Sequence, residues 1–252
     1  MTDPQTPVPA ATLVIFRERA FAAPDLLMVE RAKAMAFAGG ATVFPGGRVD
    51  PGDHALAARF EGEPDDIAAR IAAIRETIEE AGVPIGLTPM PDAATFVALR
   101  AALHAGVAFG AALHDAGVTI HPHGLVPFAR WLPGHRERRV FDTHFFLAAL
   151  PAGAPEPVVD ATENTRVFWS GAQAVLDDAT AGRQHVIFPT RRNLERLARF
   201  ASFAEACADA TAYPIRTVSP WIEDRGGVPH LCIPDDLGYP VTSEAVTSAK
   251  RG

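Results

Sequence analysis

The stretch from residue 67 to residue 83 constrains the fold most, because it combines an apolar stripe with an acidic cluster at helical spacing. The stripe consists of Ile67, Ile71, Ile74 and Ile78. This period predicts an amphipathic helix that packs one face against a core. Gly82 supplies the stop signal of that helix. We expect Asp65 or Asp66 as its N-cap, because a short side-chain oxygen can accept hydrogen bonds from the first free backbone N–H groups.

Three glutamates, Glu76, Glu79 and Glu80, stand at i, i+3 and i+4 of the same helix and share one face. The isoleucine stripe lies on a different face from Glu76 and Glu80. By itself such a triplet is most often a solvated surface with salt bridges, for example between Arg75 and Glu79. The other interpretation is a site for a divalent cation such as Mg²⁺, which prefers oxygen ligands and usually keeps waters and substrate phosphates in its shell.

Composition excludes several classes of protein. The 252 residues are 48% hydrophobic, which is enough for a sizeable core. A net charge of −7 argues against a nucleic-acid surface, because phosphate neutralisation needs a basic face. Two cysteines, Cys207 and Cys232, are too few for a disulfide framework, and their spacing suits no zinc site. Without a signal-peptide pattern or an apolar run of membrane-spanning length, we expect a cytoplasmic protein.

The chain before the acidic helix reads as short strands. Residues 12–18 and 26–31 predict a hairpin with its turn at Pro24-Asp25, and residues 41–44 predict a third strand that ends at Pro45-Gly46-Gly47. Glycines in that turn let the backbone approach a phosphate or a metal shell, or serve a turn that needs positive φ. The charged stretch between Gly52 and Arg75 is expected to begin as a loop and to end as the helix.

The rest of the chain alternates helical and strand patterns. Alanine-rich residues 92–118 predict one or two helices packed against the sheet. Strands are predicted at 125–131, 140–150 and 167–170, with a polar link over 133–139. Helices are predicted at 171–181 and 190–210, the second capped by Thr190, and a hairpin is predicted around 224–227.

The sequence shows no internal repeat and no long linker, so we expect one domain. Its predicted parts are a flexible N-terminus (1–11), the main domain (12–210), insertions at about 54–65 and 92–118, and a C-terminal extension (211–252) packed on the same domain. The sequence does not fix the oligomeric state, and a homodimer stays open.

The pattern around the acidic helix resembles the signature of the Nudix hydrolases. That signature is Gly, five residues, Glu, seven residues, then Arg-Glu-aliphatic-x-Glu-Glu-x-Gly-aliphatic. Here Gly47 is followed after five residues by Asp53, and the second half runs from Arg75 to Val83. Two departures stand out. The first acid is Asp in place of Glu, and residues 54–74 separate it from Arg75 in place of seven residues.

The long spacing is similar to that of the coenzyme A diphosphatase branch of the family, as are the runs at 35–50, 139–147 and 163–169. The resemblance covers roughly residues 12–205. It implies a Nudix-type α/β/α sandwich with a mixed sheet, and a pyrophosphatase that acts on phosphoanhydride bonds with Mg²⁺ or Mn²⁺ as cofactor. The implied substrate is coenzyme A or acyl-coenzyme A, cleaved to 3′,5′-ADP and a phosphopantetheine.

Other substrates and another class of function stay open. ADP-ribose, a dinucleotide or a nucleotide sugar are alternative substrates, and a non-catalytic nucleotide-binding Nudix protein is the alternative of another class. In every case the expected partner is a small nucleotide diphosphate, not a nucleic acid or a membrane.

The resemblance also implies roles for single residues. Metal ligands are expected at Glu76, Glu79 and Glu80. Glu76 would share a metal or position the attacking water, and Arg75 would orient a glutamate through a salt bridge. Glu163 is a candidate general base in a loop after the signature. Substrate contacts are expected at Gly46, Gly47, Arg31 and Asp53, with Arg191 and Arg192 as weaker candidates for the phosphates.

Overall fold

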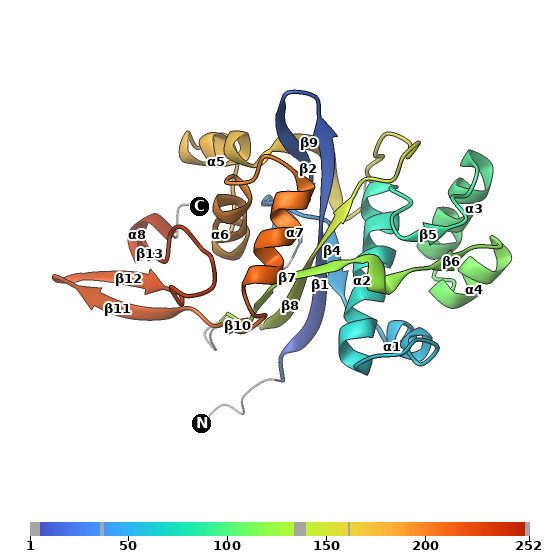
Figure 1. Ribbon diagram of the computed structural model, residues 1–252, viewed down its shortest axis with the longest axis horizontal. Coiled ribbons are helices and arrows are strands. Elements are labelled where there is room, and N and C mark those ends of the chain that lie inside the picture. Colours follow the sequence, from blue (N-terminus) through green and yellow to red (C-terminus); the bar gives the residue numbers. More distant parts are fainter. Residues whose placement is uncertain (1–5, 36–37, 134–139, 161, 250–252) are drawn as a thin grey trace.

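The computed structural model describes residues 6–35, 38–133, 140–160 and 162–249. A large mixed sheet lies at its centre and carries helices on both faces (Figure 1). Helices α1 to α4 lie on one side, and α5, α6 and α7 lie on the other. The predicted α/β/α sandwich with a mixed sheet is therefore confirmed.

The central sheet has eight strands in the order β10-β7-β8-β1-β2-β3, with β4 also paired to β1 and β9 also paired to β2. The bounds are β1 Val8–Arg19, β2 Ala22–Arg31, β3 Thr42–Val43, β4 Gly46–Arg48, β7 Val126–Trp131, β8 Phe141–Ala149, β9 Asn164–Gly171 and β10 Thr217–Val218. β1 runs parallel to β8 and antiparallel to β2 and β4. Two strands, β2 and β4, thus bring residues from distant parts of the sequence to the same end of the sheet.

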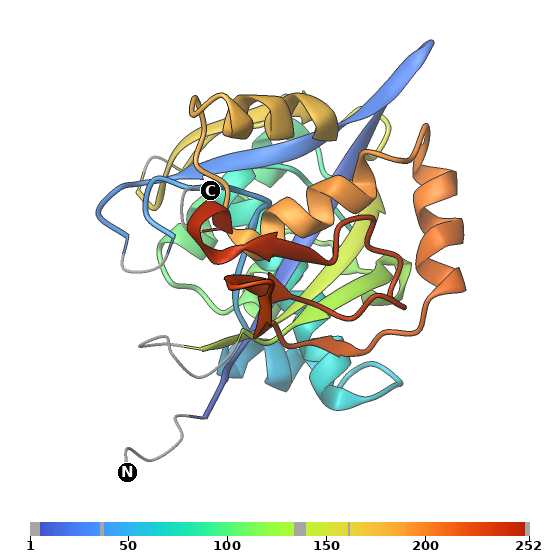
Figure 2. The ribbon, with the colours of Figure 1, turned by 90° about the vertical axis from the view of Figure 1, so that its left-hand side faces the viewer.

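The hairpin β1–β2 forms as predicted, but the predicted turn at Pro24-Asp25 is wrong. Both residues lie within β2, and the chain turns at Phe21, which is exposed and has φ 61°. Asp25 stays in the strand because it is buried and accepts hydrogen bonds from Arg17 and Arg19 of β1. The tip of this hairpin projects from the body of the molecule (Figure 2).

The start of β1 and the end of the third predicted strand differ from the predictions. Residues 8–11, predicted as part of a flexible N-terminus, begin β1, because Val8 N–H donates to the Val140 carbonyl and the strand pairs with β8 from there on. Residues 1–5 of that segment lie outside the described residues. The third strand is β3, as predicted. Gly46 and Gly47, predicted only to end it, start β4 and pair with β1.

The helices are α1 Pro51–Ala57, α2 Pro64–Ala81, α3 Ala93–His104, α4 Phe109–Asp115, α5 Ala172–Thr180, α6 Phe188–Leu197, α7 Phe203–Ala212 and α8 Val246–Ala249, with a 3₁₀ turn at Pro122–Gly124. The predicted single helix over 190–210 is two helices, because Ser202 accepts from the Glu205 N–H and begins α7. Thr190 is not a cap, since α6 starts before it with Ile187 at the N-cap.

Helix α2 confirms the apolar stripe. Its four isoleucines are buried, and Gly82 ends the helix with φ 62°. The predicted cap at Asp65 or Asp66 is wrong. The N-cap is Glu63, whose side chain accepts from the Asp66 N–H, because Pro64 fits the first helical turn and makes the preceding residue the cap.

The segment 92–118 forms two helices, which is one of the two predicted alternatives. The predicted packing against the sheet is wrong. Phe96 and Leu99 of α3 and Phe109 of α4 join the core around α2, which already covers that face (Figure 1). A two-stranded antiparallel sheet of β5 Leu87–Thr88 and β6 Thr119–Ile120 closes the base of this insertion.

The C-terminal region contains the predicted hairpin, formed by β11 Trp221–Arg225 and β12 Val228–Cys232, and β13 Ser243–Ala245 adds a third strand. The region contacts the rest of the fold through Tyr239, whose hydroxyl accepts from Trp131 Nε1 at 3.0 Å and donates to Asn193 Oδ1 at 3.1 Å. The division into a main domain and an extension stays a prediction. Most of the predicted link 133–139 lies outside the described residues.

The buried apolar residues form two clusters, one on each face of the sheet. The first surrounds α2, and the second lies under α5, α6 and α7. Across the described ranges, none of the helices has both the length and the apolar character needed to cross a membrane.

Candidate active site

Glu80 lies where α2, β2 and β4 meet. It is 4% exposed, and its Oε2 accepts a hydrogen bond from the Gly46 N–H at 2.9 Å. Arg31, at the end of β2, places Nη1 at 3.7 Å from Glu80 Oε1. The structure thus brings together Glu80, Gly46 and Arg31, which the sequence predicted separately.

Glu76 lies against the second glycine of β4. Arg75 Nη1 donates to Glu76 Oε1 at 2.9 Å. A Cβ atom built at Gly47 would be 2.4 Å from the Glu76 carboxylate, so a larger residue there would require that carboxylate to move. Glu79 is more open, with its Oε2 at 3.5 Å from Arg75 Nη1. Gly47 therefore leaves room for the Glu76 carboxylate in its present position.

Asp53 and Arg75 form a buried ion pair. Arg75 donates from Nε to Asp53 Oδ1 at 3.0 Å and from Nη2 to Oδ2 at 2.8 Å, and Asp53 is 1% exposed. Asp53 Oδ2 also accepts from the Asp50 N–H at the start of α1. The geometry gives no support to the predicted substrate contact at Asp53, because both of its oxygens are occupied. Asp53 instead fixes the arginine that orients Glu76 and Glu79.

The electrostatics of this face follow from burial. Loss of hydration disfavours the charged form, so burial raises the pKa of Glu76 to about 8 even though Arg75 lowers it. Burial likewise raises the pKa of Glu80 to about 7, against the lowering effect of Asn164, the Gly46 N–H and Arg31. The pKa of Glu79 is raised in the same direction, again by burial. In the absence of a cation, these carboxyl groups therefore keep their protons to a higher pH than ordinary glutamates, because their protein partners do not offset the cost of burial.

The donor set of this face fits a divalent cation. All its side-chain donors are carboxylate oxygens, the ligand type that Mg²⁺ and Mn²⁺ prefer. Within the residues that the structure describes, no three acidic, His or Cys side chains are grouped so that they could hold a metal ion by themselves. Mg²⁺ does not need such a cage, because waters and substrate phosphates usually complete its shell.

Glu163 is connected to the end of α2 through the loop that precedes β9. Asp160 N–H donates to the Glu80 carbonyl at 3.2 Å, and Glu163 N–H donates to Asp160 Oδ2 at 3.0 Å. The Glu163 side chain is 58% exposed, with Oε2 at 3.9 Å from Arg31 Nη2. The candidate general base thus stands at the open edge of the glutamate cluster.

Two residues near the glutamates were not predicted. Arg100 of α3 donates to the Glu79 carbonyl from Nε at 3.1 Å and from Nη2 at 2.8 Å, which satisfies the C-terminal end of α2. Asn164 is buried beside Glu80. Neither has a local signal in the sequence, because both contacts join elements far apart in the chain.

Arg192, a weaker candidate for a phosphate contact, lies away from the glutamates. It is buried in α6, on the other face of the sheet, where it donates to Glu195 at 2.8 Å and to Glu244 at 2.9 Å. Arg191 precedes it on the same helix. The structure therefore gives no support to a phosphate contact at either position.

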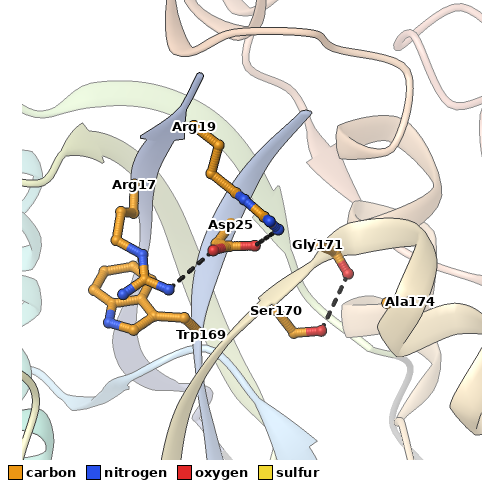
Figure 3. Close-up of a pocket in the computed structure, with 7 residues that line it drawn as sticks. All are labelled: Arg17, Arg19, Asp25, Trp169, Ser170, Gly171 and Ala174. Atoms are coloured by element: carbon orange, nitrogen blue, oxygen red, sulfur yellow. Dashed lines mark hydrogen bonds and ion pairs between the residues drawn. The ribbon is translucent and has the colours of Figure 1, made fainter. Parts of the chain in front are cut away.

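A surface hollow of about 620 Å³ lies elsewhere, lined by Arg17, Arg19, Asp25, Trp169, Ser170, Gly171 and Ala174 (Figure 3). Arg17 lies over the Trp169 ring at 4.6 Å, and both arginines reach Asp25. Asp25 is six residues from Arg31 along β2, or about 20 Å. The hollow is thus separate from the carboxylates.

No protein-family model matches the chain. Among solved structures, a Nudix hydrolase from Alicyclobacillus acidocaldarius is similar with a TM-score of 0.70 and 28% identity, over 81% of this chain and 96% of that chain. The Nudix domain of Shewanella oneidensis NrtR, complexed with ADP ribose, has a TM-score of 0.44 and 14% identity, over 78% and 91% of the two chains. An Ap4A hydrolase from C. elegans has a TM-score of 0.39 and 18% identity, over 81% and 96%.

The last two similarities are too low to support an inference. The first similarity is one of both fold and sequence, and it covers 96% of that Nudix hydrolase. The chain has the fold of the Nudix hydrolases, and this similarity supports its place in the Nudix superfamily.

Proposed function

We propose that the chain is a magnesium-dependent pyrophosphatase that cleaves the diphosphate of nucleoside diphosphate-linked small molecules. The observation that carries the proposal is the face of Glu76, Glu79 and Glu80, packed against the Gly46-Gly47 strand with more carboxylates than cations. A pyrophosphatase acting on phosphoanhydride bonds is also supported by the similarity to the Nudix hydrolase from Alicyclobacillus acidocaldarius.

The three glutamates are the residues that would hold Mg²⁺, or Mn²⁺ in its place. A divalent cation bound there neutralises charge on the diphosphate and makes a water easier to deprotonate. Arg75 keeps Glu76 and Glu79 in place from one side, while the Gly46 N–H fixes Glu80 from the other.

Arg31 and Glu163 are the groups proposed to meet the substrate and the water. Arg31 approaches both Glu80 and Glu163 beyond hydrogen-bond distance, so its guanidinium keeps donors for a phosphate. Glu163 is exposed and can accept the proton of the attacking water, with Glu76 as the alternative acceptor. Attack on phosphorus breaks the bridging P–O bond and leaves two monophosphates, one of which carries the water oxygen.

Coenzyme A or an acyl derivative is the first substrate to test, and the resemblance of the spaced signature supports it. Cleavage would yield 3′,5′-ADP and the corresponding phosphopantetheine. ADP-ribose, dinucleotides and nucleotide sugars are the alternatives. A cytoplasmic location and a homodimer stay predictions.

The experiment is a panel of these compounds incubated with purified protein and Mg²⁺, with products identified by mass spectrometry and a chelator as the metal-free control. We expect coenzyme A to be cleaved and the chelator to stop the reaction. Cleavage of another nucleotide while coenzyme A stays intact would end the substrate proposal and leave the reaction class standing. Binding without cleavage of any compound would identify a nucleotide-binding protein instead.

A further inference from the structure

Asn164 is held beside the C-terminal end of α2 by the loop before β9. It pairs with Arg31 of β2 and is 1% exposed. Its N–H donates to Asp160 Oδ1 at 3.1 Å, and the Asp160 N–H donates to the Glu80 carbonyl at 3.2 Å. Asp160 thus ties the backbone of Asn164 to that of Glu80, through its side chain on one side and its N–H on the other.

The side chain of Asn164 lies close to two carboxylates, those of Glu80 and Asp160. Among the described residues, however, neither its Nδ2 nor its Oδ1 has a partner at hydrogen-bond geometry, although both atoms are buried. Buried polar atoms without a partner are rare and costly, and an apolar side chain of similar size would fill the same space. The amide therefore needs a reason other than packing, and its neighbour is a predicted metal ligand.

We propose that Asn164 is a positioning residue that donates from its amide to the Glu80 carboxylate and holds it in the orientation needed to bind the cation. The inference rests on the proposed function. The Gly46 N–H fixes one oxygen of Glu80, and Arg31 stays 3.7 Å from the other. Asn164 is the donor from β9 that can restrain this second oxygen.

Asn193 offers a matched control. It is 0% exposed in α6, in the core on the opposite face of the sheet, and its Nδ2 also has no partner among the described residues. Tyr239 donates to its Oδ1. Replacing either asparagine by leucine removes a buried amide, but only one of the two lies beside the glutamates.

The test measures Mn²⁺ binding by the electron paramagnetic resonance of free Mn²⁺, together with thermal unfolding of the metal-free proteins. We expect Asn164→Leu to weaken Mn²⁺ binding by about tenfold or more, as loss of an outer partner of a ligand does, and Asn193→Leu to leave it within about twofold. In hydrolysis, the Mg²⁺ concentration at half-maximal rate should rise for Asn164→Leu while kcat at saturating Mg²⁺ largely recovers.

Mn²⁺ affinity of Asn164→Leu equal to that of the wild type would overturn the inference and leave Asn164 a core residue. If that variant fails to fold, Asn164→Ala replaces it, with the same expected loss and the same contradicting result. Wild-type protein that neither binds Mn²⁺ nor hydrolyses a diphosphate would instead contradict the proposed function itself.

Discussion

Helices α2 and α6 both carry buried arginines and carboxylates, on opposite faces of the sheet (Figure 1). Around α6, two arginines lie within ion-pair distance of three carboxylates, namely Arg192 with Glu195 and Glu244, and Arg196 with Asp209. At the start of α2, Arg70 pairs with Asp66. At the glutamates of α2, two arginines face six carboxylates in the described part of the chain, namely Arg75 with Asp50, Asp53, Glu76 and Glu79, and Arg31 with Glu80 and Glu163.

The comparison shows that a raised pKa does not by itself mark a site. Burial raises the pKa of Glu195 to about 7, as it does for Glu80. The difference lies in the number of cations and in the glycine strand that approaches Glu76 and Glu80. The α6 network is nearly balanced by its own arginines, whereas the α2 face has more carboxylates than arginines, and a bound cation would balance those that lose their protons.

The largest expected effect is a loss of activity in variants of the α2 glutamates that the control variant in α6 does not show. Glu79→Gln and Glu80→Gln should each lower kcat/KM by about a thousandfold or more, or about 4 kcal/mol, because each removes a predicted metal ligand. Metal-free stability should be unchanged or raised, since repulsion on the face is relieved. The control Glu195→Gln should keep its activity. Equal loss in all three variants, or joint loss of folding and activity in the first two, would make the glutamates structural.

The next effect concerns stability. Arg75→Met should lower the free energy of unfolding by about 3 kcal/mol, because it leaves the buried Asp53 without its arginine partner. Urea unfolding measures it. The double variant Arg75→Met/Asp53→Leu should recover much of that stability but not the activity, since Glu76 and Glu79 still lack their arginine. Recovery of both properties would show that Arg75 serves only to neutralise Asp53.

Local signals allowed much of this to be predicted. The isoleucine period and Gly82 define α2, and the three glutamates follow from it. The Asp53–Arg75 pair could not be predicted, because the intervening residues were expected to begin as a loop. Pro51 at the first turn of α1, with an acid at Asp53, was the signal that could have found that helix.

The third prediction concerns pH. The folded-state pKa values of Glu76, Glu80 and Glu195 are raised from 4.5 to about 8, about 7 and about 7, so the folded protein holds protons that the unfolded chain releases. Their contribution to stability is present below about pH 4.5 and lost as pH rises through about 7 to 8.

The melting temperature of the metal-free protein should therefore fall by a few degrees between about pH 5 and pH 8. Mg²⁺ should raise it most at the upper end, because it binds the deprotonated face. Glu195→Gln should make the fall of the melting temperature smaller, but it should not change the increase that Mg²⁺ causes. A melting temperature that Mg²⁺ leaves unchanged at pH 8 would contradict the comparison.

The smallest expected effect tests the close contact between β4 and the Glu76 carboxylate. Gly47→Ala should push the Glu76 carboxylate aside and lower activity by roughly tenfold, about the cost of disturbing an outer contact of a metal site. The control Gly52→Ala, which has nothing within 4 Å of its added Cβ, should keep full activity. Full activity in both variants would mean that the position of Glu76 does not matter.

The contacts that complete the site depend on tertiary structure. Arg100 reaches α2 from the helical insertion, and Asn164 reaches Glu80 only because β9 pairs with β2 in one register. Arg192 was predicted as a weaker candidate for a phosphate contact, because the pattern of α6 does not reveal that Glu244 of β13 pairs with it. Pairings between distant elements leave no period in the sequence.

The most direct test of the central claim is a single-turnover reaction of a nucleoside diphosphate-linked substrate in ¹⁸O-labelled water at increasing Mg²⁺. We predict that the rate rises with Mg²⁺, that one ¹⁸O atom appears in one of the two monophosphate products, and that chelation returns the rate to background. Substrate recovered intact and unlabelled from its complex with the protein at saturating Mg²⁺ would contradict the claim.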